Sequence, residues 1–278
     1  MPPQSPASRP QRPLGTPTRG KTAPNRLRKT DTFLAVAYTE FIRHMPGLYV
    51  DLGYGFYPIT SVETLRRLRR LNPTLQVLGV EIEAQRVADA QPFAVDAGLS
   101  FRLGGFNLPL RPGEQASVIR AFNVLRQYDE AAVAAALAAL AAALTSGGLV
   151  VEGTSDPLGR LLSFNLYEKQ ADHLARIALV LAPALRADFL PRQFQAVLPK
   201  NFIHHAEPGG PIDLFFADWH AAWQHARRQA HQPRQVFAQA ALRLADHYGY
   251  DLDRRPALLR RGFLVLRPDW PAKRPVPR

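Results

Sequence analysis

The chain has 278 residues, of which 46% are hydrophobic, and it contains no cysteine. This composition supports a substantial core and excludes disulfides, thiolate metal ligands and a thiol nucleophile. No apolar run reaches the roughly 18 to 20 residues that span a bilayer, and no apolar segment follows the basic N-terminus as in a secretory signal. These features predict a soluble, cytoplasmic protein that does not associate with membranes.

The net charge of +12 lies mainly at the two ends of the chain. Residues 1–29 contribute seven of these charges and residues 268–278 a net two, so the body carries +3. Both ends are rich in proline, which predicts disordered tails around one domain over residues 30–267. A nucleic-acid-binding arm is the alternative, but residues 1–29 lack aromatic side chains that could stack on bases. The near-neutral body also disfavours a nucleic-acid partner.

In chain order, the first part of the body alternates between helix and strand patterns. A helix is predicted over 31–45, with Thr30 or Asp31 as its cap, because apolar residues recur at helical spacing. The spacing then predicts a strand at 48–52, a helix from a capping box at 60–63 to about 71, a strand at 76–82, a helix at 83–90, and strands at 99–103 and 117–122. An alanine-rich helix over 129–144, stopped by Gly147 and Gly148, precedes a strand at 149–152.

Strands that alternate with helices predict a parallel sheet covered on both faces, as in a Rossmann-like, doubly wound α/β domain. The pattern changes after this point. An antiparallel hairpin is predicted from strands at 162–167 and 174–181, followed by helices at 192–203, 212–230 and 233–248 and an edge strand at 262–266. Residues 46–155 are therefore the expected ligand-binding core, and residues 156–267 complete the sheet and elaborate the substrate side.

The most informative segment is the apolar strand that ends in Asp51 and continues into the turn Gly53-Tyr54-Gly55. Glycines at the carboxyl end of such a strand let the backbone approach a ligand closely. The next strand ends in Glu81, which can accept hydrogen bonds from the two ribose hydroxyls of an adenosine. Acids and glycines in this register indicate a nucleoside site.

On these residues the chain resembles the class I S-adenosylmethionine-dependent methyltransferases over about residues 46–155, and it looks like a bacterial branch of that superfamily. The resemblance implies that S-adenosylmethionine is the cofactor. By resemblance, the loop around the amino-acid part of the cofactor consists of Asp51, Gly53, Tyr54 and Gly55, and Glu81 binds the ribose. The resemblance also implies that Ile82, Gly105 and Phe106 lie near the adenine. Asn123 is expected beside the cofactor. In the place of a third alternate glycine, common in the family, this chain has Tyr57.

A nicotinamide or flavin site is the competing interpretation of the glycine turn. That site requires Gly-x-Gly-x-x-Gly followed by an acid about 20 residues onward. Here Pro58 stands where the third glycine would be, and Glu81 lies well beyond the required spacing. The dinucleotide interpretation is therefore disfavoured.

The methyl acceptor is not indicated by the sequence. The Asn/Asp-Pro-Pro-aromatic signature of amide and exocyclic amine methylation is absent, and the lack of cysteine excludes a covalent 5-methylpyrimidine mechanism. The histidines show no metal-ligand spacing, so no metal is predicted. Residues that could face a substrate are Arg126, Tyr128, Glu152, Lys200 and His204, each with an ordinary structural interpretation. A catalytically inactive cofactor-binding protein and an RNA methyltransferase that uses its basic tails stay open as alternatives.

Overall fold

A computed structural model describes residues 12–186 and 188–271 of the chain. An eight-stranded sheet forms its centre, in the order β3-β2-β1-β4-β5-β6-β7-β8. The strands are β1 (Leu48–Leu52), β2 (Val77–Glu81), β3 (Leu99–Leu103), β4 (Ala116–Phe122), β5 (Leu144–Ser155), β6 (Leu162–Gln170), β7 (His173–Ala182) and β8 (Leu264–Leu266). The first five pair in parallel and the last three antiparallel. The predicted doubly wound, mostly parallel sheet with an antiparallel hairpin is confirmed.

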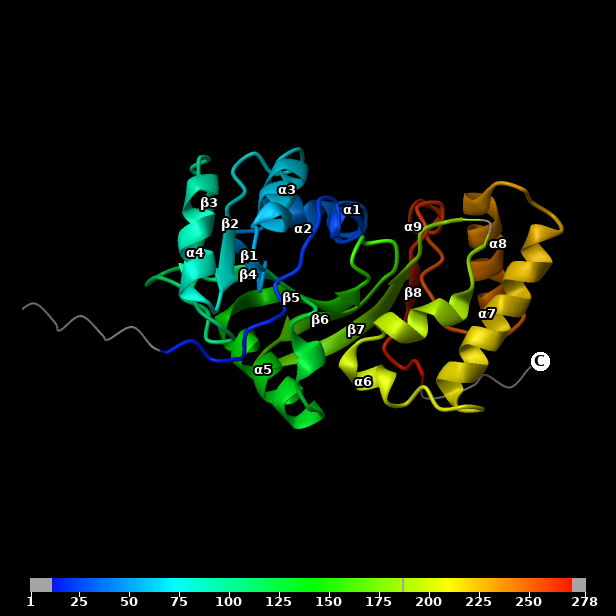
Figure 1. The fold of residues 1–278 in the computed structure, drawn as a ribbon. Helices are drawn as coiled ribbons and strands as arrows, with labels where there is room; N and C mark the ends of the chain where they lie inside the picture. The colour runs from blue at the N-terminus through cyan, green and yellow to red at the C-terminus, as the bar shows by residue number, and fades with distance from the viewer. Residues whose placement is uncertain (1–11, 187, 272–278) are drawn as a thin grey trace, which may run out of the picture.

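Helices cover both faces of this sheet (Figure 1). The helices are α1 (Arg28–Ala37), α2 (Thr39–His44), α3 (Ile59–Leu68), α4 (Ala84–Ala90), α5 (Glu130–Ala143), α6 (Lys200–Ile203), α7 (Pro211–Arg227), α8 (Pro233–Asp246) and α9 (Pro256–Leu259). Three short 3-10 helices are η1 (Gln91–Phe93), η2 (Leu125–Gln127) and η3 (Pro191–Val197). Within the described part of the chain, no helix is long and apolar enough to cross a membrane.

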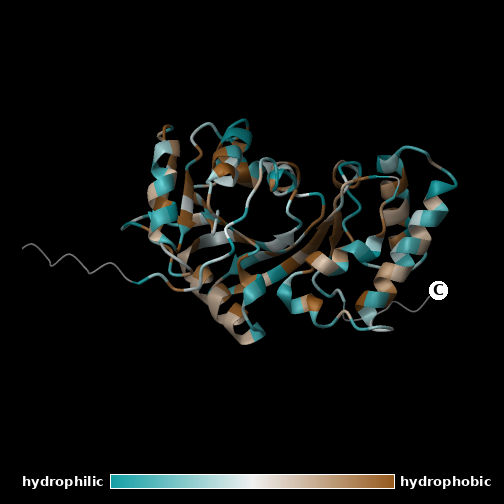
Figure 2. Cartoon of the chain, viewed as in Figure 1, coloured by the Kyte–Doolittle hydropathy of each residue, from teal (hydrophilic) through white to brown (hydrophobic). Residues whose placement is uncertain are grey.

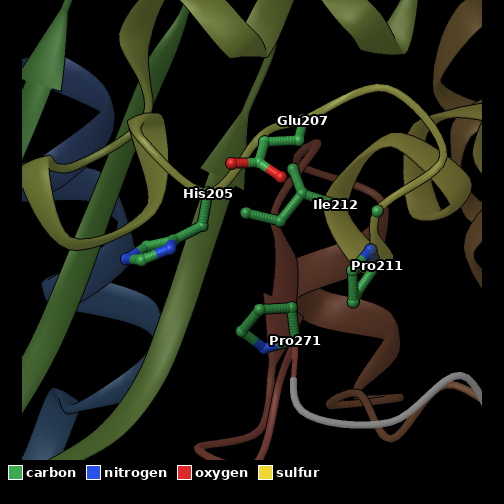
Figure 3. Close-up of a pocket in the computed structure, with 6 residues that line it drawn as sticks. His205, Glu207, Pro211, Ile212 and Pro271 are labelled. Carbon is green, nitrogen blue, oxygen red and sulfur yellow. The ribbon is translucent and has the colours of Figure 1, made fainter.

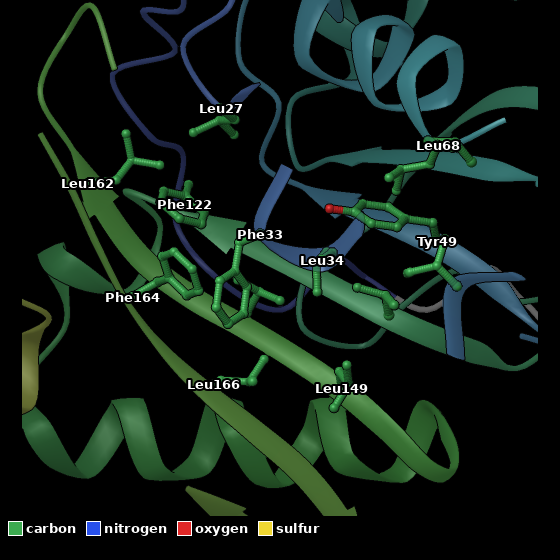
Figure 4. Packing of buried hydrophobic residues seen from close by; sticks show 14 of the residues in the cluster. Leu27, Phe33, Leu34, Tyr49, Leu68, Phe122, Leu149, Leu162, Phe164 and Leu166 are labelled. Carbon is green, nitrogen blue, oxygen red and sulfur yellow. The ribbon is translucent and has the colours of Figure 1, made fainter. Parts of the chain in front are cut away.

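The strands alternate apolar side chains between two faces, and each face has its own core. On one face, α1 to α4 pack on the sheet, with Phe33 of α1 set 5.3 Å from Phe164 of β6 between ring centroids. Figure 4 shows Phe33 and Leu34 pointing from α1 toward Phe164 and Tyr49. On the other face, α5 covers the parallel strands, and α7 and α8 cover the antiparallel ones. Figure 2 shows brown gathered in the central strands, whereas most helices carry both teal and brown residues.

The predicted helix over 31–45 is two helices, because Tyr38 leaves the helical conformation at φ −129°. Its predicted cap was also wrong: α1 begins at Arg28, and both Thr30 and Asp31 are buried within it. Likewise, the capping-box interpretation of 60–63 was wrong, since Thr60 donates its hydroxyl proton to Asp51 Oδ2 at 2.7 Å. Gly147 lies inside β5, which begins directly after α5, rather than ending the helix.

Both ends of the domain extend beyond the predicted boundaries. The tail predicted over 1–29 includes residues 12–29, which the structure places against the domain, with Leu27 buried in the core. At the other end, Trp270 is buried, with its ring centroid 5.1 Å from that of Phe202. Arginine- and proline-rich composition did not reveal these apolar anchors. The remaining tail residues, 1–11 and 272–278, lie outside the described part of the chain.

Candidate functional site

The predicted site lies at the carboxyl edge of the parallel strands. From β1 the chain proceeds to β2 on one side, while β4 lies on the other side, so the strand order reverses between β1 and β4. Open α/β sheets bind ligands in the crevice that forms at such a switch point. Here the loop after β1 touches the loop after β4: a Cβ added to Gly53 would lie 2.7 Å from Val124 Cγ2.

The glycine turn has the backbone conformation that its sequence predicts. Gly53 has φ 73° and Gly55 has φ 90°, values that residues with a side chain rarely adopt. The Gly53 N–H donates to the Val80 carbonyl at 2.8 Å, and the Gly55 N–H donates to Glu81 Oε2 at 3.0 Å. These bonds tie the turn to the end of β2.

Glu81 is almost fully buried beneath this turn, with 1% of its side chain exposed. Its Oε1 accepts a hydrogen bond from the Ile82 N–H at 2.9 Å and lies 3.6 Å from Arg86 Nη1. Arg86 itself stacks on Phe56, with Cζ 4.4 Å from the ring centroid. The Glu81 carboxylate, predicted to bind a ribose, is therefore held in place by N–H groups of the loops after β1 and β2 and by the Arg86 guanidinium.

A small cavity adjoins Glu81, with a volume of about 20 Å³. It is lined by Leu14, Gly15, Thr16, Thr18, Leu52, Gly53, Glu81, Ile82, Gly104, Gly105, Phe106, Val124 and Tyr128. The structure thus brings together five of the predicted site residues: Gly53, Glu81, Ile82, Gly105 and Phe106. Tyr128, predicted to face a substrate, packs edge-on against Phe106 at 5.4 Å between centroids.

Four of the lining residues belong to a segment that we name the N-terminal strap, residues 12–20. It crosses the carboxyl edge of the sheet and contacts the loops after β1, β3 and β4. Sequence reasoning missed it, because a segment rich in arginine, proline and threonine has the composition of a tail. Its two glycines, Gly15 and Gly20, both with positive φ, were the available signal of an ordered, closely packed path.

Asp51 does not face the cavity, in contrast to the prediction. Its Oδ2 accepts hydrogen bonds from the hydroxyls of Thr60 at 2.7 Å and Ser61 at 2.8 Å, both at the start of α3. Its Oδ1 accepts from Arg120 Nε at 3.0 Å. Asp51 therefore holds the helix that follows the glycine turn, which positions the turn without contact to a ligand.

Arg120 lies on β4 and is completely buried between two carboxylates. Its Nη1 donates to Asp31 Oδ1 at 2.8 Å, and its Nη2 lies 2.9 Å from Asp51 Oδ2. Burial alone would lower the pKa of Arg120, but its neighbours, led by the Asp51 carboxylate, together outweigh burial and raise that pKa. Burial raises the pKa of Asp31, which Arg120 and Arg67 oppose. This network joins α1, α3, β1 and β4 beneath the site, and sequence patterns did not indicate it.

Tyr54, Tyr57 and Asn123 do not line the small cavity. Tyr54 is turned into the core, where it packs on Phe101 at 5.3 Å and donates its hydroxyl proton to the Arg86 carbonyl. Tyr57 is 66% exposed, so its ring does not fill the cavity. Asn123, at φ 59°, accepts the Ser155 N–H at 3.2 Å and lies at the ends of β4 and β5.

The remaining candidates to face a substrate do not line the small cavity. Glu152 is buried on β5, where its Oε2 accepts a hydrogen bond from Asn165 at 2.9 Å. Burial raises the pKa of Glu152 to about 7. Lys200 and His204 belong to α6 and its C-cap, and Arg126 is exposed on η2. Among the described residues, no group of three or more metal-ligating side chains could hold a metal ion.

A second pocket, of about 300 Å³, lies on the C-terminal side of the molecule (Figure 3). His205, Glu207, Gly210, Pro211, Ile212 and Pro271 line it. None of these residues was predicted to belong to a site. Five of them lie between the end of α6 and the first turn of α7, and Pro271 follows β8, so the pocket is not at the carboxyl edge of the parallel strands. The glycine turns, the buried Glu81 and the strand switch point all belong to the first site.

The sheet order and the antiparallel completion define a Rossmann-like fold of the methyltransferase type. The sequence matches no family model and no curated protein. Solved structures similar to part of the chain include magnesium protoporphyrin IX methyltransferase from Synechocystis PCC 6803 with bound SAM, at 20% identity and a TM-score of 0.33. Another is an S-adenosylmethionine-dependent methyltransferase from Mesorhizobium loti, at 21% identity and a TM-score of 0.31.

These similarities cover only part of each protein. The alignments include 46% and 44% of this chain, and 59% and 54% of the Synechocystis and Mesorhizobium chains. The chain therefore spans little more than half the length of these structures. The fold assignment is based on the strand order of the sheet.

Proposed function

We propose that this protein binds S-adenosylmethionine at the carboxyl edge of β1, β2 and β4 and transfers its methyl group to an acceptor. The observation that supports this function is the convergence of Gly53, Gly55 and the buried Glu81 at the strand switch point. A carboxylate at the end of β2 is placed to accept hydrogen bonds from ribose hydroxyls. The left-handed glycines allow close approach of the main chain to the amino-acid part of the cofactor.

The residues around Glu81 have the chemistry that a nucleoside requires. Ile82 and Phe106 supply apolar side chains to flank an adenine, and Phe106 is in turn supported by Tyr128. Gly105 presents bare main chain to the cavity, since an added Cβ would lie 2.0 Å from the Leu14 carbonyl oxygen. The cofactor would supply an activated methyl group for in-line displacement, so that alignment and exclusion of water account for much of the catalysis.

The first test is titration calorimetry of the full chain with S-adenosylmethionine and S-adenosylhomocysteine. We expect binding that is lost in Gly53→Val, whose side chain would collide with Val124, and weakened at least ten-fold in Glu81→Ala. Matched controls are Gly113→Val, at another left-handed glycine with no neighbour within 4 Å of its added Cβ, and Glu40→Ala, at an exposed glutamate of α2. Circular dichroism of all four variants tests folding.

Either result is informative about the proposed function. Binding by the wild type and both controls, with loss in the two site variants, would establish the cofactor site. The absence of binding by the wild type and by every variant, in preparations that hold no co-purified ligand, would refute the proposal. Binding without product from a panel of acceptors, followed as S-adenosylhomocysteine release, would favour the catalytically inactive alternative.

A further inference from the structure

The N-terminal strap, residues 12–20, follows a defined path along the proposed cofactor cleft. Figure 1 shows the dark-blue segment before α1 as it passes β5 toward α1. Beyond the strap, Arg26 donates from Nε to Ser155 Oγ at 2.9 Å, and Lys29 donates to the Ala182 carbonyl at 3.0 Å. These contacts anchor the chain at the ends of β5 and β7. The segment that follows the strap is therefore fixed to the sheet.

The first half of the strap contacts the walls predicted to enclose the adenine. The Leu14 carbonyl accepts the Phe106 N–H at 2.8 Å, and the Leu14 N–H donates to Asn107 Oδ1 at 2.7 Å. The N–H and the hydroxyl of Thr16 both donate to the Tyr128 hydroxyl oxygen, at 2.5 and 2.9 Å. A Cβ added to Gly15 would lie 3.4 Å from the Phe106 ring.

The second half of the strap contacts the glycine turn. The Gly20 carbonyl accepts the Phe56 N–H at 2.9 Å, and it lies 2.4 Å from the position of a Cβ added to Gly55. The Thr18 carbonyl accepts a hydrogen bond from Arg86 Nη2 at 3.1 Å. The main chain of the strap therefore packs against Gly55, at the place where the absence of a side chain would let a ligand approach the turn.

The space between the strap and the cleft walls is too small for a nucleoside. Sites for drug-sized ligands have volumes of about 300 to 1,000 Å³, whereas about 20 Å³ remains between the strap and Glu81. That volume accommodates about one water molecule. Strap and cofactor therefore compete for the same part of the cleft.

The contacts that hold the strap are of a kind that can be released. Leu14 is 54% exposed, and Arg12, Thr16 and Arg19 are also exposed residues. The strap is held mainly by main-chain hydrogen bonds, which contribute little net stability because each exchanges with water. Little apolar surface keeps this segment in the cleft.

We propose that the N-terminal strap is an internal occupant of the cofactor cleft, and that S-adenosylmethionine binds only to the fraction of molecules whose strap has left it. The inference rests on the proposed function and adds autoinhibition of the same site by the chain's own residues. A ligand that binds one of two states has its affinity reduced by the fraction of the competent state. Weakening the strap should consequently strengthen cofactor binding.

The first experiment follows the position of the strap by trypsin cleavage of the Arg19–Gly20 bond in the full chain, with products identified by mass spectrometry. Arg19 is exposed but Gly20 is buried against the glycine turn, so cleavage requires the strap to leave the cleft. We expect S-adenosylhomocysteine to accelerate this cleavage. The Arg228–Gln229 bond, exposed after α7, serves as the internal reference and should not respond. Protection of Arg19–Gly20 by the ligand would overturn the inference, because the strap would then close over bound cofactor.

The second experiment compares affinities of strap variants for S-adenosylhomocysteine. Asn107→Ala removes two hydrogen bonds to the strap, to the Leu14 N–H and the Arg12 carbonyl, and Asn107 does not line the cavity. Gly15→Ala introduces a side chain at φ 134° and 3.1 Å from the Tyr128 hydroxyl. We expect both variants to bind about three- to ten-fold more tightly than the wild type and to be cleaved faster without ligand. The matched controls are Gly113→Ala, at a left-handed glycine with open space around it, and Gln85→Ala, at an exposed residue of α4.

The outcomes separate this inference from the proposed function. Weaker or unchanged binding by variants whose Arg19–Gly20 bond is cleaved faster would overturn autoinhibition and leave cofactor binding intact. The absence of binding by the wild type and by all variants would refute the proposed function, and autoinhibition with it. Faster cleavage in Asn107→Ala and Gly15→Ala would still show that the strap docks as described.

Discussion

Arg120 of β4 and Asp31 of α1 form a buried ion pair, with Nη1 and Oδ1 2.8 Å apart, in a position that no ligand can reach. Asp51 completes the arrangement from the other side of the guanidinium. The acid that precedes the glycine turn therefore belongs to the framework of the domain. Its role is to fix the strand and helix between which the turn is formed.

Removal of Arg120 should destabilise the protein strongly. Arg120→Ala leaves the carboxylates of Asp31 and Asp51 buried without their shared cation, and loss of one partner of a buried pair costs about 3–5 kcal/mol. Urea denaturation measures the change in the free energy of unfolding. Arg43→Ala, which breaks an exposed pair with Glu40, is the control and should cost at most about 1 kcal/mol. Equal effects of the two variants would contradict the structural role of the network.

Glu152 should make stability depend on pH. Its folded pKa is raised to about 7 from an ordinary 4.5, because burial disfavours the carboxylate. Below pH 4.5 the group is protonated in both states; as the pH rises toward 7 the unfolded state ionises first, and the folded state loses relative stability. The loss amounts to about 3 kcal/mol above pH 7.

Glu152→Gln tests this assignment, because the amide keeps an acceptor for Asn165 and cannot ionise. The variant should gain stability over the wild type above pH 7 and match it near pH 4. Thermal unfolding across pH 4–8 supplies the measurement, with Glu130→Gln on the exposed start of α5 as the control. A constant difference between wild type and Glu152→Gln over this range would show that Glu152 does not titrate as described.

Asp129 should contribute to the stability of α5 as its N-cap. Its carboxylate accepts the Ala132 N–H at 2.7 Å, which satisfies one of the amide groups left unpaired at the start of a helix. Asp129→Ala should lower the free energy of unfolding by about 1 kcal/mol, and Asp129→Asn by much less. Urea titrations of the two variants test the prediction. Equal losses would indicate that the charge rather than the cap is responsible.

Tyr128 should hold the strap through its hydroxyl group. Tyr128→Phe removes the acceptor of the Thr16 N–H but keeps the ring against Phe106. We expect trypsin cleavage at Arg19–Gly20 to accelerate about five-fold, since such a bond contributes about 1 kcal/mol. The variant should retain the wild-type unfolding temperature within a few degrees. An unchanged cleavage rate would mean that this hydrogen bond does not restrain the strap.

The amino-acid sequence alone determined the parallel core and the location of the candidate site. Apolar runs that alternate with helical patterns predict the strands β1 to β5 and their parallel arrangement, and the spacing of Gly53, Gly55 and Glu81 predicts a nucleoside site. These signals are local: a periodicity reports burial of one face, and a glycine turn reports a backbone conformation. In the structure Gly53 and Glu81 line one small cavity with Ile82, Gly105 and Phe106, three residues that only the resemblance to the methyltransferases implied.

Only the tertiary structure decided where Asp51 and the N-terminal strap lie. From the sequence, Asp51 could bind a ligand or stabilise the fold. It does the latter because it pairs with Arg120, which is distant in sequence but adjacent in space. The strap has the composition of a tail, yet its main chain pairs with loops after three different strands. Hydrogen bonds between main-chain groups leave almost no pattern in side-chain composition, so their partners become apparent only once the chain is folded.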